Sequence, residues 1–166
     1  MVWTSNLLLC FFAAVVVLSN EAASQASVDA PLVQENLTLR SEIKRGWDAA
    51  GDCVKGLLAL DTMSDCIFKS SNDNRKMMGA GTEAFDLGLS FGGWLHATLS
   101  GEALAGTPDF AQQAQHIAAT KKIFWGTYVD LRKKVNLTDD QVIEATGLKA
   151  ENLHAKVTAA ATEYGD

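Results

Sequence analysis

Few side chains in this 166-residue sequence are of the types that do chemistry, and their spacing argues against a catalytic centre. His96, His116 and His154 lie far apart and form no HxxxH or HExxH pair, the spacings that place two imidazoles on one metal ion. No GxSxG motif or glycine-rich loop followed by lysine occurs. Asp86 stands alone in an apolar stretch, which is weak support for acid–base catalysis. The residues favour a non-enzymatic binding protein with no catalytic residue, no metal and no cofactor.

Two cysteines are spaced for a disulfide that requires a chain reversal. Cys10 lies in the apolar N-terminal segment, which leaves Cys53 and Cys66 for the body of the chain, and such a pair is typically bridged in an oxidising compartment. On one continuous helix they would lie about 20 Å apart, whereas a disulfide allows roughly 7 Å between α-carbons. Residues 61–64 (DTMS) have turn and capping side chains. We therefore expect a disulfide-stapled helical hairpin; the alternative is two buried free thiols.

The N-terminal residues predict export. Residues 7–18 (LLLCFFAAVVVL) form an apolar run that is shorter than the roughly 20 residues needed to cross a bilayer. Small residues follow, and their pattern allows cleavage after Ser24 or after Ala26. We expect a signal peptide at residues 1–26 and a single secreted, extracellular domain at residues 27–166, with no transmembrane segment. The alternative is an apolar helix that is retained as an anchor.

Two N-x-[ST] sequons, at Asn36 and Asn136, predict glycosylation if the chain enters a eukaryotic secretory pathway. The triplet is frequent by chance, so it carries little weight alone. Asn136 also has the composition of a residue that closes one helix, with Thr138 opening the next.

Apolar spacing predicts helix along most of the chain. Residues 29–31 (DAP) are typical of a helix start, and apolar residues recur from there to Leu57 at spacings of three, four and seven. Gly46 and Gly51 weaken this helix and predict a kink or break. Residues 70–74 (SSNDN) carry turn-forming side chains and predict a loop.

The longest predicted helix begins at Thr107, a capping residue, with proline at the first helical position. Its apolar seam follows alternating spacings of four and three: Phe110, Ala114, Ile117, Lys121, Phe124, Tyr128, Leu131 and Val135. A capping box at residues 138–141 and a helix-stopping Gly147 bound a short helix. A last helix is predicted within residues 149–163.

The glycine-rich centre of the sequence is compatible with either a strand or a helix. Residues 85–91 (FDLGLSF) alternate apolar and polar side chains as a strand does. The same region has small residues at steps of four, a stripe that lets another helix approach closely: Ala80, Ala84, Gly88, Gly92, His96 and Ser100. No other segment alternates to pair with a strand, so helix is favoured. The expected fold is an all-α bundle of four to six helices.

The C-terminal residues resemble a DNA-binding motif that the charge of the chain argues against. Residues 137–157 resemble the bacterial helix-turn-helix, with Gly147 at the turn and Leu148 and Leu153 at apolar positions. They depart from it at Ile143, where the motif has a small residue. The chain carries 14 basic and 20 acidic residues, and nucleic-acid affinity depends largely on basic groups. We interpret the segment as two packed helices and expect no nucleic-acid partner.

Two functional hypotheses follow. In the first, the protein carries an apolar small molecule between helices, in a cavity walled by Phe85, Leu89, Phe91, Trp94, Phe124 and Tyr128. In the second, it is an effector that binds a protein partner or an anionic membrane surface through a basic-aromatic helix. Its surface residues would be Lys121, Lys122, Trp125, Arg132, Lys133 and Lys134. We favour the carrier, because the apolar residues near Trp94 outnumber what one helix seam needs.

Overall fold

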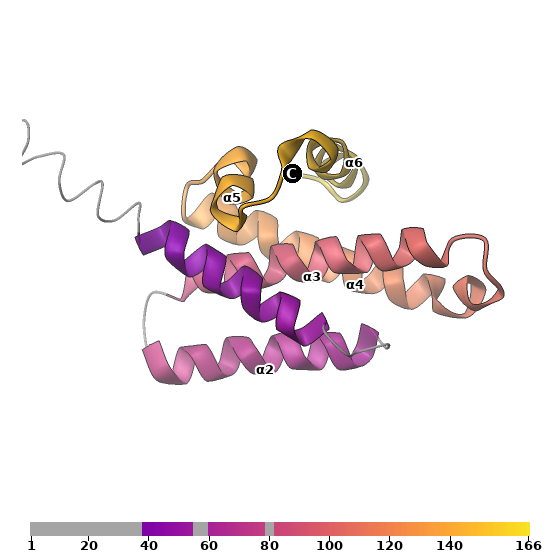
Figure 1. Cartoon of the computed structure of the whole chain (residues 1–166), viewed down its shortest axis with the longest axis horizontal. Coiled ribbons are helices and arrows are strands. Elements are labelled where there is room, and N and C mark those ends of the chain that lie inside the picture. Colours follow the sequence, from indigo (N-terminus) through magenta and orange to yellow (C-terminus); the bar gives the residue numbers. More distant parts are fainter. Residues whose placement is uncertain (1–37, 55–59, 79–81) are drawn as a thin grey trace, which may run out of the picture. The chain divides into compact units, whose positions relative to one another are not determined.

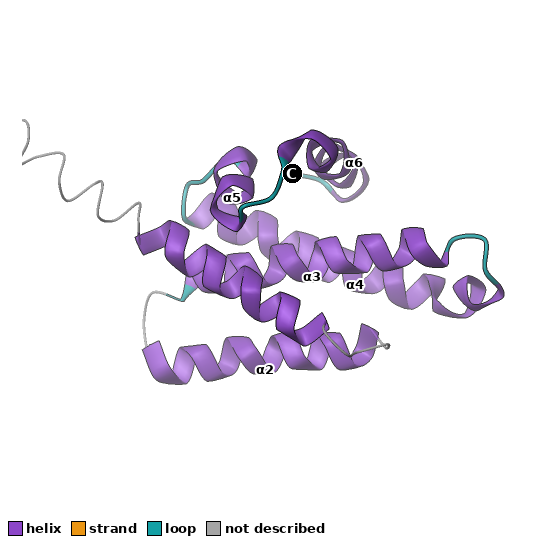
Figure 2. Ribbon diagram, in the orientation of Figure 1, coloured by secondary structure: helices purple, strands orange, loops and turns teal. Residues whose placement is uncertain are grey.

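The computed structural model describes residues 38–54, 60–78 and 82–166. The chain divides into an N-terminal unit at residues 1–38 and a main unit at residues 39–166. The main unit contains the helices described here. Six α-helices and one short 3-10 turn make up its described secondary structure, with no strand among the described residues (Figure 2). This confirms the predicted all-α bundle.

The helices follow one another with short connections (Figure 1). Helix α1 is described over residues 38–54. The others are α2 (Leu60–Met78), α3 (Glu83–Leu104), α4 (Pro108–Lys134), α5 (Asp139–Thr146) and α6 (Leu153–Tyr164), with a 3-10 turn at Ala150–Asn152. The segment that alternates in sequence is therefore helical and lies in α3, as the absence of a partner strand predicted.

Helices α3 and α4 form the centre of the bundle and run side by side over most of their length (Figure 1). Nearly the whole first two-thirds of α3 is buried on every side, from Ala84 to Leu95. A helix that is apolar all round has to be covered on all sides. Helices α1, α2 and α4 supply that cover, as the contacts below show.

The small-residue stripe of α3 allows α1 to approach at backbone distance. A Cβ atom added at Gly88 would lie 2.1 Å from the Ile43 carbonyl oxygen of α1, and one at Gly92 would lie 2.5 Å from the Ala50 Cβ. The reverse contact is made by Gly46, where a Cβ atom would lie 2.0 Å from the Phe85 carbonyl oxygen. The predicted close approach is confirmed. No break occurs at Gly46 or Gly51, since α1 continues through both.

The Cys53–Cys66 disulfide joins α1 to α2, with 5.6 Å between the two α-carbons. This confirms the predicted staple. The position of the predicted turn is wrong, because residues 61–64 belong to the first turns of α2 rather than to a reversal. Met63 at this position is buried in the core at 1% exposure.

The loop predicted at residues 70–74 is also wrong, because α2 runs through it to Met78. The reason is tertiary. Asn74 is buried, and its Oδ1 accepts a hydrogen bond of 2.6 Å from Arg45 Nη2 of α1. The same guanidinium lies 4.4 Å from the centroid of the Phe85 ring. These contacts hold a turn-forming residue inside a helix, where local preference alone would not place it.

The predicted capping box and glycine stop of α5 are present, whereas the predicted threonine cap of α4 is not. Thr138 accepts from Gln141 N at 3.3 Å and Gln141 Oε1 accepts from Thr138 N at 2.9 Å, which is the predicted capping box. Gly147 ends α5 in the left-handed conformation, with φ of 73°. At the start of α4 the proline is in place, but Thr107 makes no side-chain cap. Its Oγ1 donates to the Leu104 carbonyl oxygen at 2.7 Å instead.

Several predictions fall outside the described residues: the signal peptide at residues 1–26, the helix start at residues 29–31, the sequon at Asn36, and the stripe position Ala80. The second sequon residue, Asn136, is exposed directly after α4 and adopts a left-handed φ of 54°. Asn136 therefore lies in the turn that ends α4, as the sequence predicts, and its glycosylation stays a prediction.

Candidate functional site

Most of the aromatic residues predicted as a cavity wall pack against one another. Phe91 and Trp94 of α3 meet Trp125 and Tyr128 of α4 in a closed ring of contacts. The ring centroids are 5.6 Å apart for Phe91–Trp94 and 4.9 Å for Trp94–Trp125. They are 5.2 Å apart for Trp125–Tyr128 and 5.1 Å for Phe91–Tyr128. All four side chains are buried. These rings fill the space between the two helices, so they form core rather than a ligand cavity.

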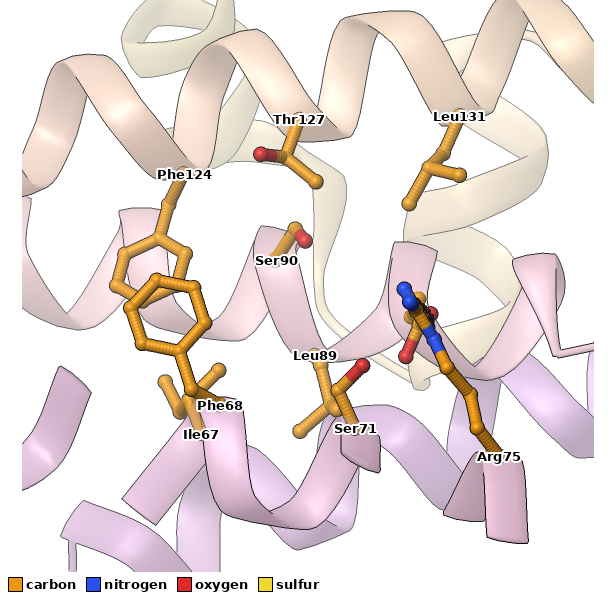
Figure 3. A pocket seen from close by; sticks show the side chains of 10 residues that line it. Ile67, Phe68, Ser71, Arg75, Leu89, Ser90, Phe124, Thr127 and Leu131 are labelled. Carbon is orange, nitrogen blue, oxygen red and sulfur yellow. Dashed lines mark hydrogen bonds and ion pairs between the residues drawn. The ribbon is translucent and has the colours of Figure 1, made fainter. Parts of the chain in front are cut away.

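A pocket of about 150 Å³ does lie beside this core, between α2, α3 and α4 (Figure 3). Its lining residues are Ile67, Phe68, Ser71, Arg75, Asp86, Leu89, Ser90, Phe124, Thr127 and Leu131. Of the six predicted wall residues, Leu89 and Phe124 line it and the other four do not. The rings of Phe68 and Phe124 stack at one end, with 6.0 Å between centroids. The pocket thus has an apolar body with hydroxyl groups at its sides.

Asp86 supplies the one carboxylate of this pocket. The residue is 6% exposed. Its Oδ2 accepts hydrogen bonds from Arg75 Nη2 at 2.9 Å and Nε at 3.3 Å. Its Oδ1 is buried and has no hydrogen-bond partner within the described part of the chain. The Arg75 side chain is 61% exposed, so a solvated cation covers a buried anion whose second oxygen is unsatisfied. A buried acceptor in this state is costly and uncommon.

The aromatic residue of the predicted basic-aromatic surface, Trp125, is buried in the core. Trp125 is 2% exposed, and its indole N–H donates to the Gly165 carbonyl oxygen at 2.8 Å. In the described structure its ring is therefore not available to a partner. The sequence placed Trp125 beside the seam, and the C-terminal residues cover that side of α4. The exposed apolar residue of this region is Ile123, at 54%.

Three of the five basic residues on this helix are held in ion pairs within the chain. Lys134 Nζ donates to Glu83 Oε1 at 2.7 Å. Lys121 Nζ lies 4.0 Å from Glu163 Oε2. Arg132 pairs with Asp139, at 3.2 Å from its Nε, and also with Asp166. Lys122 and Lys133 are exposed and form no ion pair with the residues that the structure describes. The predicted surface is thus reduced to two unpaired lysines that are eleven positions apart.

A second, more open groove lies at the other end of α3 and α4, with a volume of about 330 Å³. Small residues of both helices form its floor, and Phe110, Lys121, Glu163 and Tyr164 stand at its sides. Burial raises the pKa of Tyr164 to about 12, so its phenol stays neutral at ordinary pH. Among the described residues that line this groove, the Tyr164 hydroxyl is the one buried polar side-chain group without a hydrogen-bond partner.

Two further features of the described residues concern metal ligation and a buried phenol. Residues 38–54, 60–78 and 82–166 contain no group of three metal-ligating side chains. Tyr128 donates its hydroxyl hydrogen to Asp139 of α5, and burial raises the pKa of this phenol, with the hydrogen bond to Asp139 adding to the shift. A phenol with a raised pKa is a poor nucleophile or base at neutral pH. The pair instead ties α5 to α4.

The sequence did not reveal the contribution of α2 to the pocket. Ile67, Phe68, Ser71 and Arg75 follow a helical spacing of three and four that places them on one face. That spacing was the available signal. Because residues 70–74 have the composition of a loop, the sequence predicts that the helix ends before them, and the spacing is not recognised as one helical face. The apolar surroundings of Asp86 are visible in the sequence, but its partner Arg75 lies in a part of α2 for which the sequence does not predict helix.

Comparisons with protein families, with curated proteins and with solved structures found no match to this chain. Within the described residues, no helix is both long enough and apolar enough to cross a membrane. The binding site is therefore inferred from the geometry of the pocket.

Proposed function

We propose that this chain is a secreted, non-enzymatic binding protein, and that it takes a small, largely apolar molecule into the pocket between α2, α3 and α4. Secretion is supported by the export-type N-terminal sequence and by the Cys53–Cys66 bridge, since disulfides persist mainly in oxidising compartments. The observation that carries the binding proposal is a pocket with largely apolar walls that is also lined by Asp86, a buried residue whose Oδ1 has no hydrogen-bond partner among the described residues. Binding sites typically combine such walls with a few placed polar groups.

The size of the pocket limits the ligand. A protein cavity of about 150 Å³ lined by apolar side chains accepts a molecule of the size of benzene, and this pocket has a similar volume. The ligand, or the part of it that enters, is thus a single ring or a short aliphatic chain. Carriage of a large lipid, which would need several hundred Å³, is not supported.

The effector hypothesis has less support. It needs an exposed aromatic anchor and a basic face, but Trp125 is buried and three of the five basic side chains are paired within the chain. Exposed ion pairs are weak and leave both partners charged. Because each of the three basic residues has an acidic partner beside it, the positive charge of this face is largely balanced.

The proposal is tested by ligand-observed NMR with toluene as the probe. Saturable binding to the purified protein is expected. Ser71→Leu, which fills the pocket from α2, should weaken that binding about tenfold or more, because it removes most of the space for the probe. Ser64→Leu is the matched control: it lies on α2 seven residues earlier, outside the pocket lining, and should bind toluene as the parent does. Absence of saturable binding, or equal affinity in the two variants, would contradict the proposal.

A further inference from the structure

We infer that the ligand of this pocket is a small amine, whose ammonium group takes the place of Arg75 at the buried carboxylate of Asp86. The inference rests on the proposed function and adds the ligand's chemical class. It follows from an asymmetry within one ion pair. The Asp86 side chain is 8% exposed and the Arg75 side chain is 61% exposed, so the anion is fixed in the protein while the cation lies mostly in water.

The present pairing leaves the carboxylate half satisfied. Both hydrogen bonds from Arg75 go to Oδ2, at 2.9 and 3.3 Å, and Oδ1 has no donor within the described residues. A buried carboxylate gains most when both oxygens accept hydrogen bonds. An ammonium group carries three donors in a compact head. It can therefore supply a donor to Oδ1 and also replace the donor at Oδ2.

Arg75 is well placed to leave. Its guanidinium reaches Asp86 Oδ2 from α2. Because the Arg75 side chain is 61% exposed, it stays solvated when it leaves the carboxylate. The helix itself need not move, because the side chain has several rotatable bonds. Arg75 then acts as a resident cation that keeps the site neutral when the pocket is empty and competes with the ligand for the carboxylate.

The rest of the pocket suits the apolar part of such an amine. Ile67, Leu89 and Leu131 present aliphatic surface, and the Phe68 and Phe124 rings stand at one end. A carboxylate ligand would meet the negative charge of Asp86, and a purely apolar ligand would leave Oδ1 unsatisfied.

A set of probes with one ring and different head groups separates the possibilities: benzylamine, benzyl alcohol, toluene and benzoate. Benzylamine should bind about tenfold or more tightly than toluene, as expected for one charge-assisted hydrogen bond in a shielded site. Benzyl alcohol should be intermediate and benzoate weakest. Equal affinity of benzylamine and toluene would overturn the assignment of an amine and leave the proposed function standing. Absence of binding by every probe would overturn both.

Two variants test the role of the ion pair. Asp86→Asn keeps the shape of the side chain and should lower the affinity for benzylamine about tenfold or more, with toluene affinity unchanged. Asp73→Asn removes one charge from an exposed site on the same helix as Arg75 and is the control for general electrostatic effects; it should bind benzylamine as the parent does.

Arg75→Met gives the sharper result, because it is at an exposed position and keeps the side-chain bulk. If Arg75 competes with the ligand, this variant should bind benzylamine several-fold more tightly than the parent. If Arg75 only supports the pocket, the variant should bind benzylamine and toluene more weakly, and that result would overturn the inference. Circular dichroism of each variant confirms that it is folded, and the Arg75 variant keeps the test open if Asp86→Asn is unstable.

Discussion

Single atoms decide how closely the helices of this bundle pack. Gly46 and Gly51 lie on the same helix, and by sequence both weaken it equally. The structure separates them: the hydrogen that replaces a Cβ atom at Gly46 faces the Phe85 carbonyl oxygen of α3, whereas nothing lies within 4 Å of a Cβ atom built at Gly51. The first glycine is thus required by tertiary contact, and the second is not.

Substituting alanine at these two positions should therefore change stability in opposite directions. Gly46→Ala forces backbone apart from backbone and should lower the free energy of unfolding by about 3 kcal/mol or more. Gly51→Ala should raise it by about 0.5–1 kcal/mol, because alanine favours helix and no contact opposes it. Urea unfolding of both variants makes the comparison. Equal effects at the two positions would show that α1 does not meet α3 as described.

His96 gives the protein a dependence of stability on pH. The side chain is half-buried on α3, and burial lowers its pKa below the ordinary value of 6.5. Below about pH 6.5 the unfolded chain takes up a proton that the folded chain does not, so the free energy of unfolding falls as the pH is lowered through that window. His96→Gln should reduce this slope. His154→Gln, at an exposed position, is the control, and an identical slope in the parent and the His96 variant would refute the assignment.

The sequence does not predict which of the buried apolar residues line the pocket. The sequence correctly predicts that the apolar residues near Trp94 are buried, but burial alone does not say which of them face a ligand. The rings of Phe91, Trp94 and Tyr128 pack in contact with one another. By contrast, the pocket is lined by Leu89 and Phe124. Such a division depends on how the neighbouring helices are rotated, which periodicity does not determine.

At the scale of elements, helix ends were predictable where the chain uses local chemistry. The capping box of α5 and its left-handed glycine involve residues within a few positions of each other, and the sequence alone identified both. The sequence predicts a loop within α2, because its serine and asparagine residues favour turns locally. Buried contacts such as Arg45–Asn74 hold these residues in a helix instead. Local rules fail where a long-range partner outweighs them.

The two threonines at helix starts provide a test of this distinction. Thr138→Ala should lower the free energy of unfolding by about 1 kcal/mol, because its hydroxyl caps α5. Thr107→Ala should change it by less than about 0.5 kcal/mol, since Thr107 makes no cap to α4 and its hydroxyl bonds the preceding turn in solvent. Thermal unfolding of the two variants measures both. A larger loss at Thr107 than at Thr138 would mean that α4 is capped in solution in a way the structure does not have.

At the scale of the whole molecule, a secreted protein of this kind is expected to have lost its signal peptide and to contain the Cys53–Cys66 disulfide. Mass spectrometry of the chain recovered from the medium of a secreting host should find an N-terminus at Gln25 or Ser27, which follow the two expected cleavage positions. Non-reducing peptide mapping should find Cys53 linked to Cys66. Any glycan at the sequons would appear as added mass on the peptides that contain Asn36 or Asn136. An uncleaved chain that stays with the cells would contradict secretion and favour the retained anchor.

The most direct test of the central claim is to locate a bound probe in solution. In a titration of the purified protein with toluene, followed by NMR, the probe protons should show nuclear Overhauser contacts to the Ile67 and Leu89 methyl groups and to the Phe124 ring, all of which line the pocket between α2, α3 and α4. Contacts to Ala114, Ala118 or Phe110, which line the second groove, or no contact to any buried methyl group, would contradict the claim that this pocket is the binding site.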